Sequence, residues 1–171
     1  MRSFSYRIRQ HARPFTIRRA TPADAPGILA CLRVAFASYQ SSYTAPAYED
    51  TVLTGETLAQ RFQFMSILVA VSGSGGIIGT VGCNAVGNGV GHLRGMAVLK
   101  DWQGGGVAQQ LLTSVEAELR ALGCERVTLD TTAPLQRAIR FYERNGYRAT
   151  GHVSDFFGMP LFEYAKSLSR K

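Results

Sequence analysis

The stretch that decides the fold of this chain is Gln103-Gly104-Gly105-Gly106-Val107-Ala108, between a strand-like run at 93–98 and an amphipathic helix that begins at about Gly104. The first backbone N–H groups of a helix have no partner inside it, and they lie at the positive end of the helix dipole. Because glycines let a ligand come close to that backbone, such a junction can bind phosphate. The simpler alternative is a glycine-rich turn that only joins the strand to the helix.

The spacing of the glycines excludes two familiar phosphate-binding loops. A P-loop has Lys followed by Ser or Thr after its last glycine, whereas Val107-Ala108-Gln109 follows Gly106 here. A dinucleotide-binding loop needs Gly or Ala at the position of Gln109. The pattern that fits is Q/R-x-x-G-x-G/A, read as Gln103, Gly106 and Ala108. It resembles the pyrophosphate loop of the GNAT superfamily of acyl-CoA-dependent N-acyltransferases.

A second motif follows downstream. In the GNAT superfamily the helix after the second parallel strand reads N-x-x-A-x-x-[LF]-Y-x-x-x-G-[FY]. This chain matches that pattern at Ala138, Phe141, Tyr142, Gly146 and Tyr147. The two motifs occur in the superfamily's order and spacing, so the chain resembles it over roughly residues 15–166. Leu135 stands where many members have an Asn that helps to hold the pantetheine arm, so that contact is missing or supplied differently.

The order of strands and helices predicts a mixed sheet. Residues 93–131 read strand, glycine loop, helix, strand, so these two strands should be parallel and joined by a right-handed crossover. The pair Asn88-Gly89 is typical of a type I′ hairpin, which makes its flanking strands antiparallel. We therefore expect an α/β (α+β) fold with a central mixed, mostly antiparallel sheet and helices on both faces. The resemblance implies that the one parallel strand pair splays apart.

The expected elements follow from periodicity and capping residues. Expected strands cover 15–20, 67–71, 77–85, 92–98, 127–131, 147–153 and 161–165. Four helices are expected: one that follows Thr21, one at 56–64, one that begins at about Gly104, and one at 135–144. The helix after the glycines carries an apolar stripe made by Val107, Leu111, Leu112, Val115, Leu119 and Leu122. Residues 39–55 read as less regular.

Length and charge favour one folded domain, at 15–168, preceded by a flexible basic tail at 1–14. The net charge of the 171 residues is +7, and the excess lies at the two ends. Residues 1–14 carry four Arg and residues 166–171 carry three Lys or Arg, with no acid in either segment. Because the body between them is neutral, nucleic acid is not an expected partner.

The apolar runs and the cysteines indicate in which cellular compartment the protein is expected. No apolar run reaches the roughly 18 to 20 residues that span a bilayer, so no membrane partner is expected. The tail lacks the apolar stretch of a secretory signal, although its Arg and Ser content faintly suggests a transit peptide. Cys31, Cys83 and Cys124 have no C-x-x-C spacing. This indicates a reducing, cytoplasmic setting with neither a disulfide frame nor a zinc site, and no metal is expected.

The resemblance implies that acetyl-CoA donates an acetyl group to a primary amine, which attacks the thioester directly in a ternary complex. Such an amine has a pKa near 10.4, so a general base helps to supply its neutral form. We expect Tyr142 to protonate the leaving thiolate, although it can equally be a core aromatic. His92 is the expected base, Asp130 is a second candidate, and a surface histidine remains the alternative. His92, Arg94 and Met96 should share one face of their strand.

The resemblance also implies a binding surface for the cofactor. The strand residues Met96, Ala97 and Val98 would offer backbone groups to the pantetheine arm, and the Met96 amide would face the acetyl carbonyl. Ordinary sheet pairing is the alternative. The expected cofactor set is completed by Gln103, Gly104, Gly105, Gly106, Val107, Ala108, Gln109, Leu135, Ala138 and Tyr142.

The sequence does not identify the acceptor, which can be a small molecule or a peptide that carries an amine. The segment 39–55 would form its pocket in this family. Tyr39, Tyr43 and Tyr48 can line that pocket, and Glu49 and Asp50 can attract a cation or simply be solvated. Two other functions stay in view: a GNAT-fold protein that binds CoA without catalysis, and a nucleic-acid-associated protein that uses the basic ends. A homodimer is a possible assembly.

Overall fold

A computed structural model describes residues 13–168 of the chain. Its strands are β1 (Phe15–Arg19), β2 (Ser66–Ser72), β3 (Ile77–Gly87), β4 (Val90–Val98), β5 (Arg126–Thr131), β6 (Arg148–Phe156) and β7 (Met159–Ser167). Its helices are α1 (Ala25–Phe36), α2 (Ala45–Val52), α3 (Gly55–Phe64), α4 (Val107–Ala121) and α5 (Gln136–Arg144), with short 3₁₀ turns at Pro22–Asp24, Ala37–Ser42 and Lys100–Trp102. In this part of the chain, no helix is both long and apolar enough to cross a membrane.

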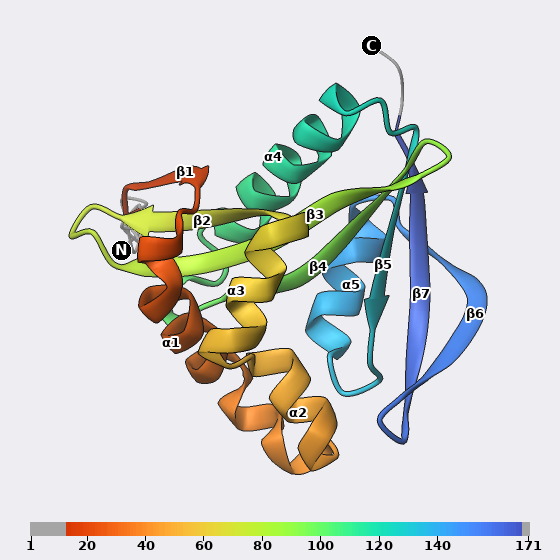
Figure 1. Cartoon of the computed structure of the whole chain (residues 1–171), viewed down its shortest axis with the longest axis horizontal. Helices are drawn as coiled ribbons and strands as arrows, with labels where there is room; N and C mark the ends of the chain where they lie inside the picture. Colours follow the sequence, from red (N-terminus) through yellow and green to blue (C-terminus); the bar gives the residue numbers. More distant parts are fainter. Residues whose placement is uncertain (1–12, 169–171) are drawn as a thin grey trace, which may run out of the picture.

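The seven strands form one sheet in the order β1-β2-β3-β4-β5-β7-β6 (Figure 1). Among the strands of residues 13–168, β4 and β5 make the single parallel pair, and the other neighbours are antiparallel. The predicted mixed, mostly antiparallel sheet is therefore confirmed. Inserting β7 between β5 and β6 gives β5 an antiparallel neighbour on its far edge.

Helices cover both faces of the sheet because the strands alternate their side chains. In β2, Leu68 and Ala70 belong to the cluster that also contains the buried stripe of α4. Ile67 and Val69 belong to the cluster that contains Ile28 and other residues of α1 and α3. The prediction of helices on both faces is confirmed.

Helix α4 begins later than the glycines suggested. Gly106 is its N-cap, with a φ of 89°, and the first helical residue is Val107 rather than Gly104. The predicted apolar stripe is buried as far as Leu119, but Leu122 is 59% exposed. The helix ends at Ala121 and Gly123 adopts a φ of 83°, so the chain turns away before Leu122 can join the stripe.

The segment that looked irregular contains a helix, α2, which corrects the expectation for 39–55. Its N-cap is Thr44, whose side chain accepts a hydrogen bond from the Ala47 amide at 3.3 Å. The Thr44 hydroxyl also donates to the carbonyl of Phe157 at 2.8 Å, which ties α2 to the tip of the β6–β7 hairpin. Segments 113 residues apart in the chain meet in this way, so the hairpin closes one side of the molecule.

The β4–β5 pair separates midway along its length. Its pairing ends at Leu93 opposite Leu129, although β4 continues to Val98 and β5 to Thr131. Figure 1 shows the two strands diverging below this point, as the splay predicted by the resemblance requires. One extra residue in β4 accompanies the divergence: Thr80 pairs with Ala97 but Gly82 pairs with Arg94, and Gly95 lies in this bulge with a φ of 67°.

The basic tail expected at 1–14 lies mostly outside the described residues. Of its arginines only Arg13 is described, and its guanidinium stacks 3.9 Å from the centroid of the Trp102 ring. The carbonyl of Pro14 accepts a hydrogen bond from the Gly73 amide at 3.2 Å. The start of the described chain is therefore attached beside the loop that precedes α4.

A buried polar cluster joins α4 to the C-terminal strands. Tyr147, which is fully buried, donates a hydrogen bond to Glu116 at 3.0 Å, and Lys166 donates to the same carboxylate at 2.9 Å. Burial and the adjacent Glu116 raise the pKa of Tyr147 well above its usual range. The tyrosine is therefore a neutral donor at any physiological pH.

We predict that Glu116→Ala lowers the free energy of unfolding by about 1–3 kcal/mol, because it leaves the buried Tyr147 hydroxyl without a partner. Denaturant unfolding followed by circular dichroism measures the change. The control is Glu118→Ala on the same helix, which removes a pair with the exposed Arg19 and should cost less than about 1 kcal/mol. Equal losses in the two variants would contradict a stabilising role for the cluster.

Candidate active site

The divergence of β4 and β5 opens a cavity of about 770 Å³. Its walls come from α1, α2, α3, β4, the glycine loop, α5, β5 and the β6–β7 hairpin. The lining includes the predicted residues His92, Met96, Ala97, Val98, Gln103, Gly104, Gly106, Val107, Ala108, Gln109, Leu135, Ala138 and Tyr142. Of the predicted catalytic and cofactor-binding residues, Gly105 is the one that does not line it. The structure therefore brings residues from both sequence motifs to one site.

The glycine loop forms one end of the cavity. Gly104 and Gly106 adopt φ values of 79° and 89°, which favour glycine, and an added side-chain carbon at either would meet nothing within 4 Å. The amide of Gln110 is bonded to the carbonyl of Gly106 at 3.0 Å, so the N–H groups of the first turn before it have no helical acceptor. These N–H groups and the open space beside them can receive a phosphate.

The last part of β4 forms the floor between the loop and the centre of the cavity. Because the Leu99 amide bonds to Ile78 of β3, strand alternation directs the peptide groups of Val98 and Met96 toward the splay. The carbonyl of Val98 accepts a hydrogen bond there from the Gln103 side chain at 3.2 Å. The glycine loop is thus fixed to the strand that leads to it.

The bulge at Gly95 corrects one prediction about this strand. Met96 packs against the α4 cluster, as Leu93 does. His92 and Arg94 point to the other face, because the extra residue shifts the alternation by one position. Met96 therefore does not share a face with His92 and Arg94.

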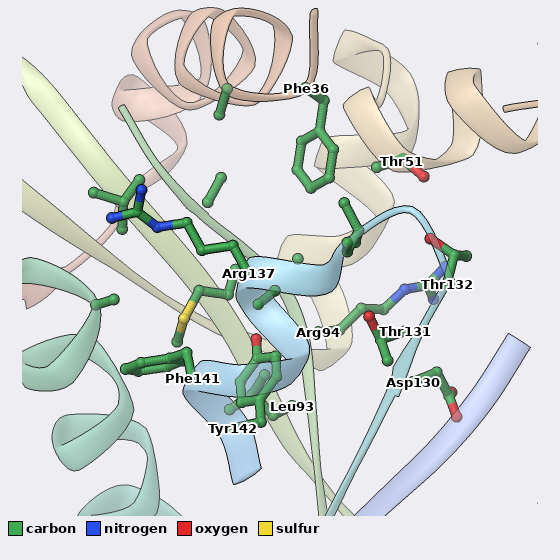
Figure 2. A pocket seen from close by; sticks show the side chains of 18 of the residues that line it. Phe36, Thr51, Leu93, Arg94, Asp130, Thr131, Thr132, Arg137, Phe141 and Tyr142 are labelled. Atoms are coloured by element: carbon green, nitrogen blue, oxygen red, sulfur yellow. The ribbon is translucent and has the colours of Figure 1, made fainter. Parts of the chain in front are cut away.

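Tyr142 of α5 is 7% exposed and lines the cavity. Figure 2 shows its hydroxyl directed toward the space that Phe36 enters from the opposite side. No hydrogen bond holds this hydroxyl within the described part of the chain. Burial raises the pKa of Tyr142 well above its usual range, so the side chain is a protonated donor.

His92 lies on β4 beside two residues of β5. Its Nδ1 shares a hydrogen bond with the Thr128 hydroxyl at 2.9 Å, and its Nε2 is 3.6 Å from a carboxylate oxygen of Asp130. Burial lowers the pKa of His92 below its ordinary value, while Asp130 acts in the opposite direction. The imidazole is therefore neutral at pH 7, with Asp130 placed to stabilise a proton on it.

The other end of the cavity is largely aromatic. Its lining includes Phe36, Tyr39 and Tyr43 and, from the hairpin, Phe156 and Leu161. Tyr43 shares a hydrogen bond with the Thr132 hydroxyl at 2.6 Å, which joins the segment before α2 to the end of β5. Of the other side chains expected in this pocket, Asp50 lines the cavity whereas Tyr48 and Glu49 do not.

Several lining residues escaped the sequence interpretation. Arg61 of α3 is buried and lines the aromatic end, whereas Arg137 and Arg144 belong to α5. Thr131 is buried, and within residues 13–168 its hydroxyl is the one such side-chain atom without a hydrogen-bond partner. Thr131 pairs with Phe162 of β7 but lies beyond Leu129, where pairing with β4 ends. The sequence of the strand does not show where that pairing ends, so it gave no sign that the Thr131 hydroxyl lacks a partner.

A family model and a relative of known activity both match acetyltransferases. A family model described as "Acetyltransferase (GNAT) family" matches residues 30–147. An aminoglycoside N(6')-acetyltransferase type 1 of Stenotrophomonas maltophilia is 31% identical over 157 residues, which cover 85% of this chain and 94% of that protein.

Solved structures share the fold at lower identity. A PaiA N-acetyltransferase of Thermoplasma acidophilum, in complex with coenzyme A, superposes with a TM-score of 0.75 at 18% identity, covering 91% of this chain and 99% of that one. A ribosomal-protein-alanine N-acetyltransferase of Brucella melitensis gives a TM-score of 0.69 at 23% identity, covering 90% and 99%.

We predict that His92 titrates with a midpoint below 6.5, because burial disfavours its charged form. An NMR pH titration of the imidazole measures this, and Asp130→Asn should lower the midpoint further by removing the opposing charge. At His92 the unfolded chain would bind a proton more readily than the folded protein does. The contribution of His92 to the free energy of unfolding is therefore complete above about pH 6.5 and is lost as the pH falls below that value. A midpoint at or above 6.5 in the unmodified protein would contradict the burial argument.

Proposed function

The chain belongs to the GNAT acetyltransferase family, and from this we propose that it transfers the acetyl group of acetyl-CoA to a primary amine by direct attack. The protein is an N-acetyltransferase that depends on acetyl-CoA. The observation that carries the proposal for the mechanism is the unpaired stretch of β4 between the glycine loop and Tyr142. One cavity there combines an anion site, free backbone groups and a protonated phenol.

The residues present fit the donor. Gly104, Gly106 and the first turn of α4 leave open space and unpaired N–H groups for the pyrophosphate. The unpartnered Thr131 hydroxyl can bond to a polar group in the splay. The Leu135 side chain offers no hydrogen bond where many family members have Asn, and the small side chain of Ala138 also lines the cavity. When bound, acetyl-CoA supplies an acetyl group activated as a thioester.

Separate groups of the chain are proposed for each step of the reaction. The Met96 amide, directed into the splay beyond the bulge, is the proposed donor to the acetyl carbonyl. The Tyr142 hydroxyl, free of other hydrogen bonds within residues 13–168, is the proposed proton donor to the leaving sulfur. Its raised pKa keeps the proton available until the sulfur becomes basic.

His92 is the proposed base. The low pKa that burial gives it leaves the imidazole neutral and able to accept a proton from the incoming amine, directly or through water. Asp130, 3.6 Å from Nε2, stabilises the imidazolium that results. Attack without a covalent acyl-enzyme is supported by the cysteines, because Cys31, Cys83 and Cys124 are buried and do not line the cavity.

We predict that Tyr142→Phe lowers kcat by about 100-fold or more while acetyl-CoA binding changes little, because a general acid is worth that much in the transition state. Thiol release with the best acceptor in a panel of amines gives kcat, and calorimetry gives the affinity. Tyr147→Phe is the matched control, since that hydroxyl is bonded to Glu116 and lies outside the cavity. Unchanged kcat in Tyr142→Phe with chemistry rate-limiting would exclude the acid role.

We also predict that Ala108→Glu weakens CoA binding by about 100-fold or more, since its carboxylate fills and repels the phosphate site. An acid in the first turn of a helix stabilises that helix, so thermal stability should not fall. Thr113→Glu, on the exposed side of α4, is the control and should bind CoA normally. Normal affinity in Ala108→Glu would contradict the assignment of the phosphate site.

A further inference from the structure

Arg61 is a buried cation that opens onto the aromatic end of the cavity. It belongs to α3, is 8% exposed and lines the cavity. Its guanidinium lies over the β4 bulge, since a side-chain carbon added to Gly95 would meet the Arg61 Nη1 at 2.9 Å. Within residues 13–168 no hydrogen bond or ion pair involves that guanidinium.

The carboxylate that acts on Arg61 is already engaged. Asp50 receives a hydrogen bond from Arg94 at 3.0 Å and acts on Arg61 only at longer range. Burial lowers the pKa of Arg61 to about 10, which still leaves it charged at pH 7. The group formed by Arg61, Arg94 and Asp50 therefore carries a net positive charge.

A buried charge without a partner is costly, and a ligand anion that pairs with it removes that cost. Guanidinium suits a carboxylate in particular, because it offers two parallel hydrogen bonds. The phosphates of CoA are not this anion in the proposed arrangement. Their site is the glycine loop, whereas Arg61 covers Gly95, the residue just before Met96 at the opposite end of the free strand.

We propose that the acceptor is a primary amine that carries its own carboxylate, of the amino-acid kind, and that Arg61 binds this carboxylate. The assignment rests on the proposed acetyl transfer to an amine. Phe36, Tyr39 and Leu161 provide an apolar wall for the rest of the acceptor. A polycationic amine is disfavoured, because it would bring further positive charge to a cation that no carboxylate neutralises.

The test compares acceptors that differ only in the carboxylate. Phenylalanine is assayed against phenylalaninamide, and 6-aminohexanoate against its amide, so that the carboxylate is offered at two distances from the amine. Kanamycin represents the polycationic amines. We expect kcat/KM, from thiol release, to be about 100-fold higher for the carboxylate in at least one pair, chiefly through KM.

Variants assign that preference to Arg61. Arg61→Gln should raise KM for the carboxylate acceptor to that of its amide, whereas Arg61→Lys should keep part of the preference. Arg33→Gln, which removes an exposed arginine of α1 outside the cavity, should change neither. CoA binding measured by calorimetry should be normal in all three variants, which shows that the donor site is intact.

The outcomes separate this inference from the proposed function. Acetylation of amides or kanamycin at least as efficient as that of the carboxylates, with Arg61→Gln unaffected, would overturn the role of Arg61 and leave acetyl transfer standing. Thiol release with none of these amines, despite normal CoA binding, would count against acetyl transfer to a primary amine itself. Loss of CoA binding in both Arg61 variants would instead assign the cation to the donor.

Discussion

The site depends on the point at which two parallel strands stop sharing hydrogen bonds. Beyond Leu93 and Leu129 the backbone of β4 faces space instead of β5. In most sheets such unpaired groups would be costly when buried. Here α5 approaches the gap with Tyr142 and Ala138, and the bulge at Gly95 turns the strand as it separates. The same break therefore creates the cavity, exposes the peptide groups of β4 and brings a phenol beside them.

Electrostatics divides the cavity into two ends that differ in how they receive an anion. At the glycine loop the positive potential comes from backbone N–H groups, whose dipoles need no counterion. At the other end it comes from the guanidinium of Arg61, a full charge whose neighbouring carboxylate, Asp50, is paired with Arg94. Between them lie the neutral imidazole of His92, with Asp130 3.6 Å from its Nε2, and the protonated phenol of Tyr142.

The sequence predicted the site best where its residues are close together in the chain and form a motif. Gln103–Ala108 and Ala138–Tyr147 each form a local motif, and the resemblance they carry predicted the splay and nearly all of the residues that line the glycine-loop end of the cavity. The bulge at Gly95 could not be predicted, because a register shift depends on the partner strand. Arg61 was not singled out in the sequence, because its burial arises only when α3 packs across β4. Helix α2 was missed because 39–55 lacks a clear apolar period.

The hydrogen bond between Thr44 and Phe157 has a consequence for how the protein is made. It joins residues 113 positions apart, whereas the strand, loop and helix of the donor end are consecutive in the chain. Contacts between distant residues form late, because closing a long loop costs entropy before any contact compensates for it. During synthesis the half that contains the glycine loop is therefore expected to gain structure while the hairpin is still inside the ribosome, and the aromatic wall of the cavity is completed only when the last strands emerge.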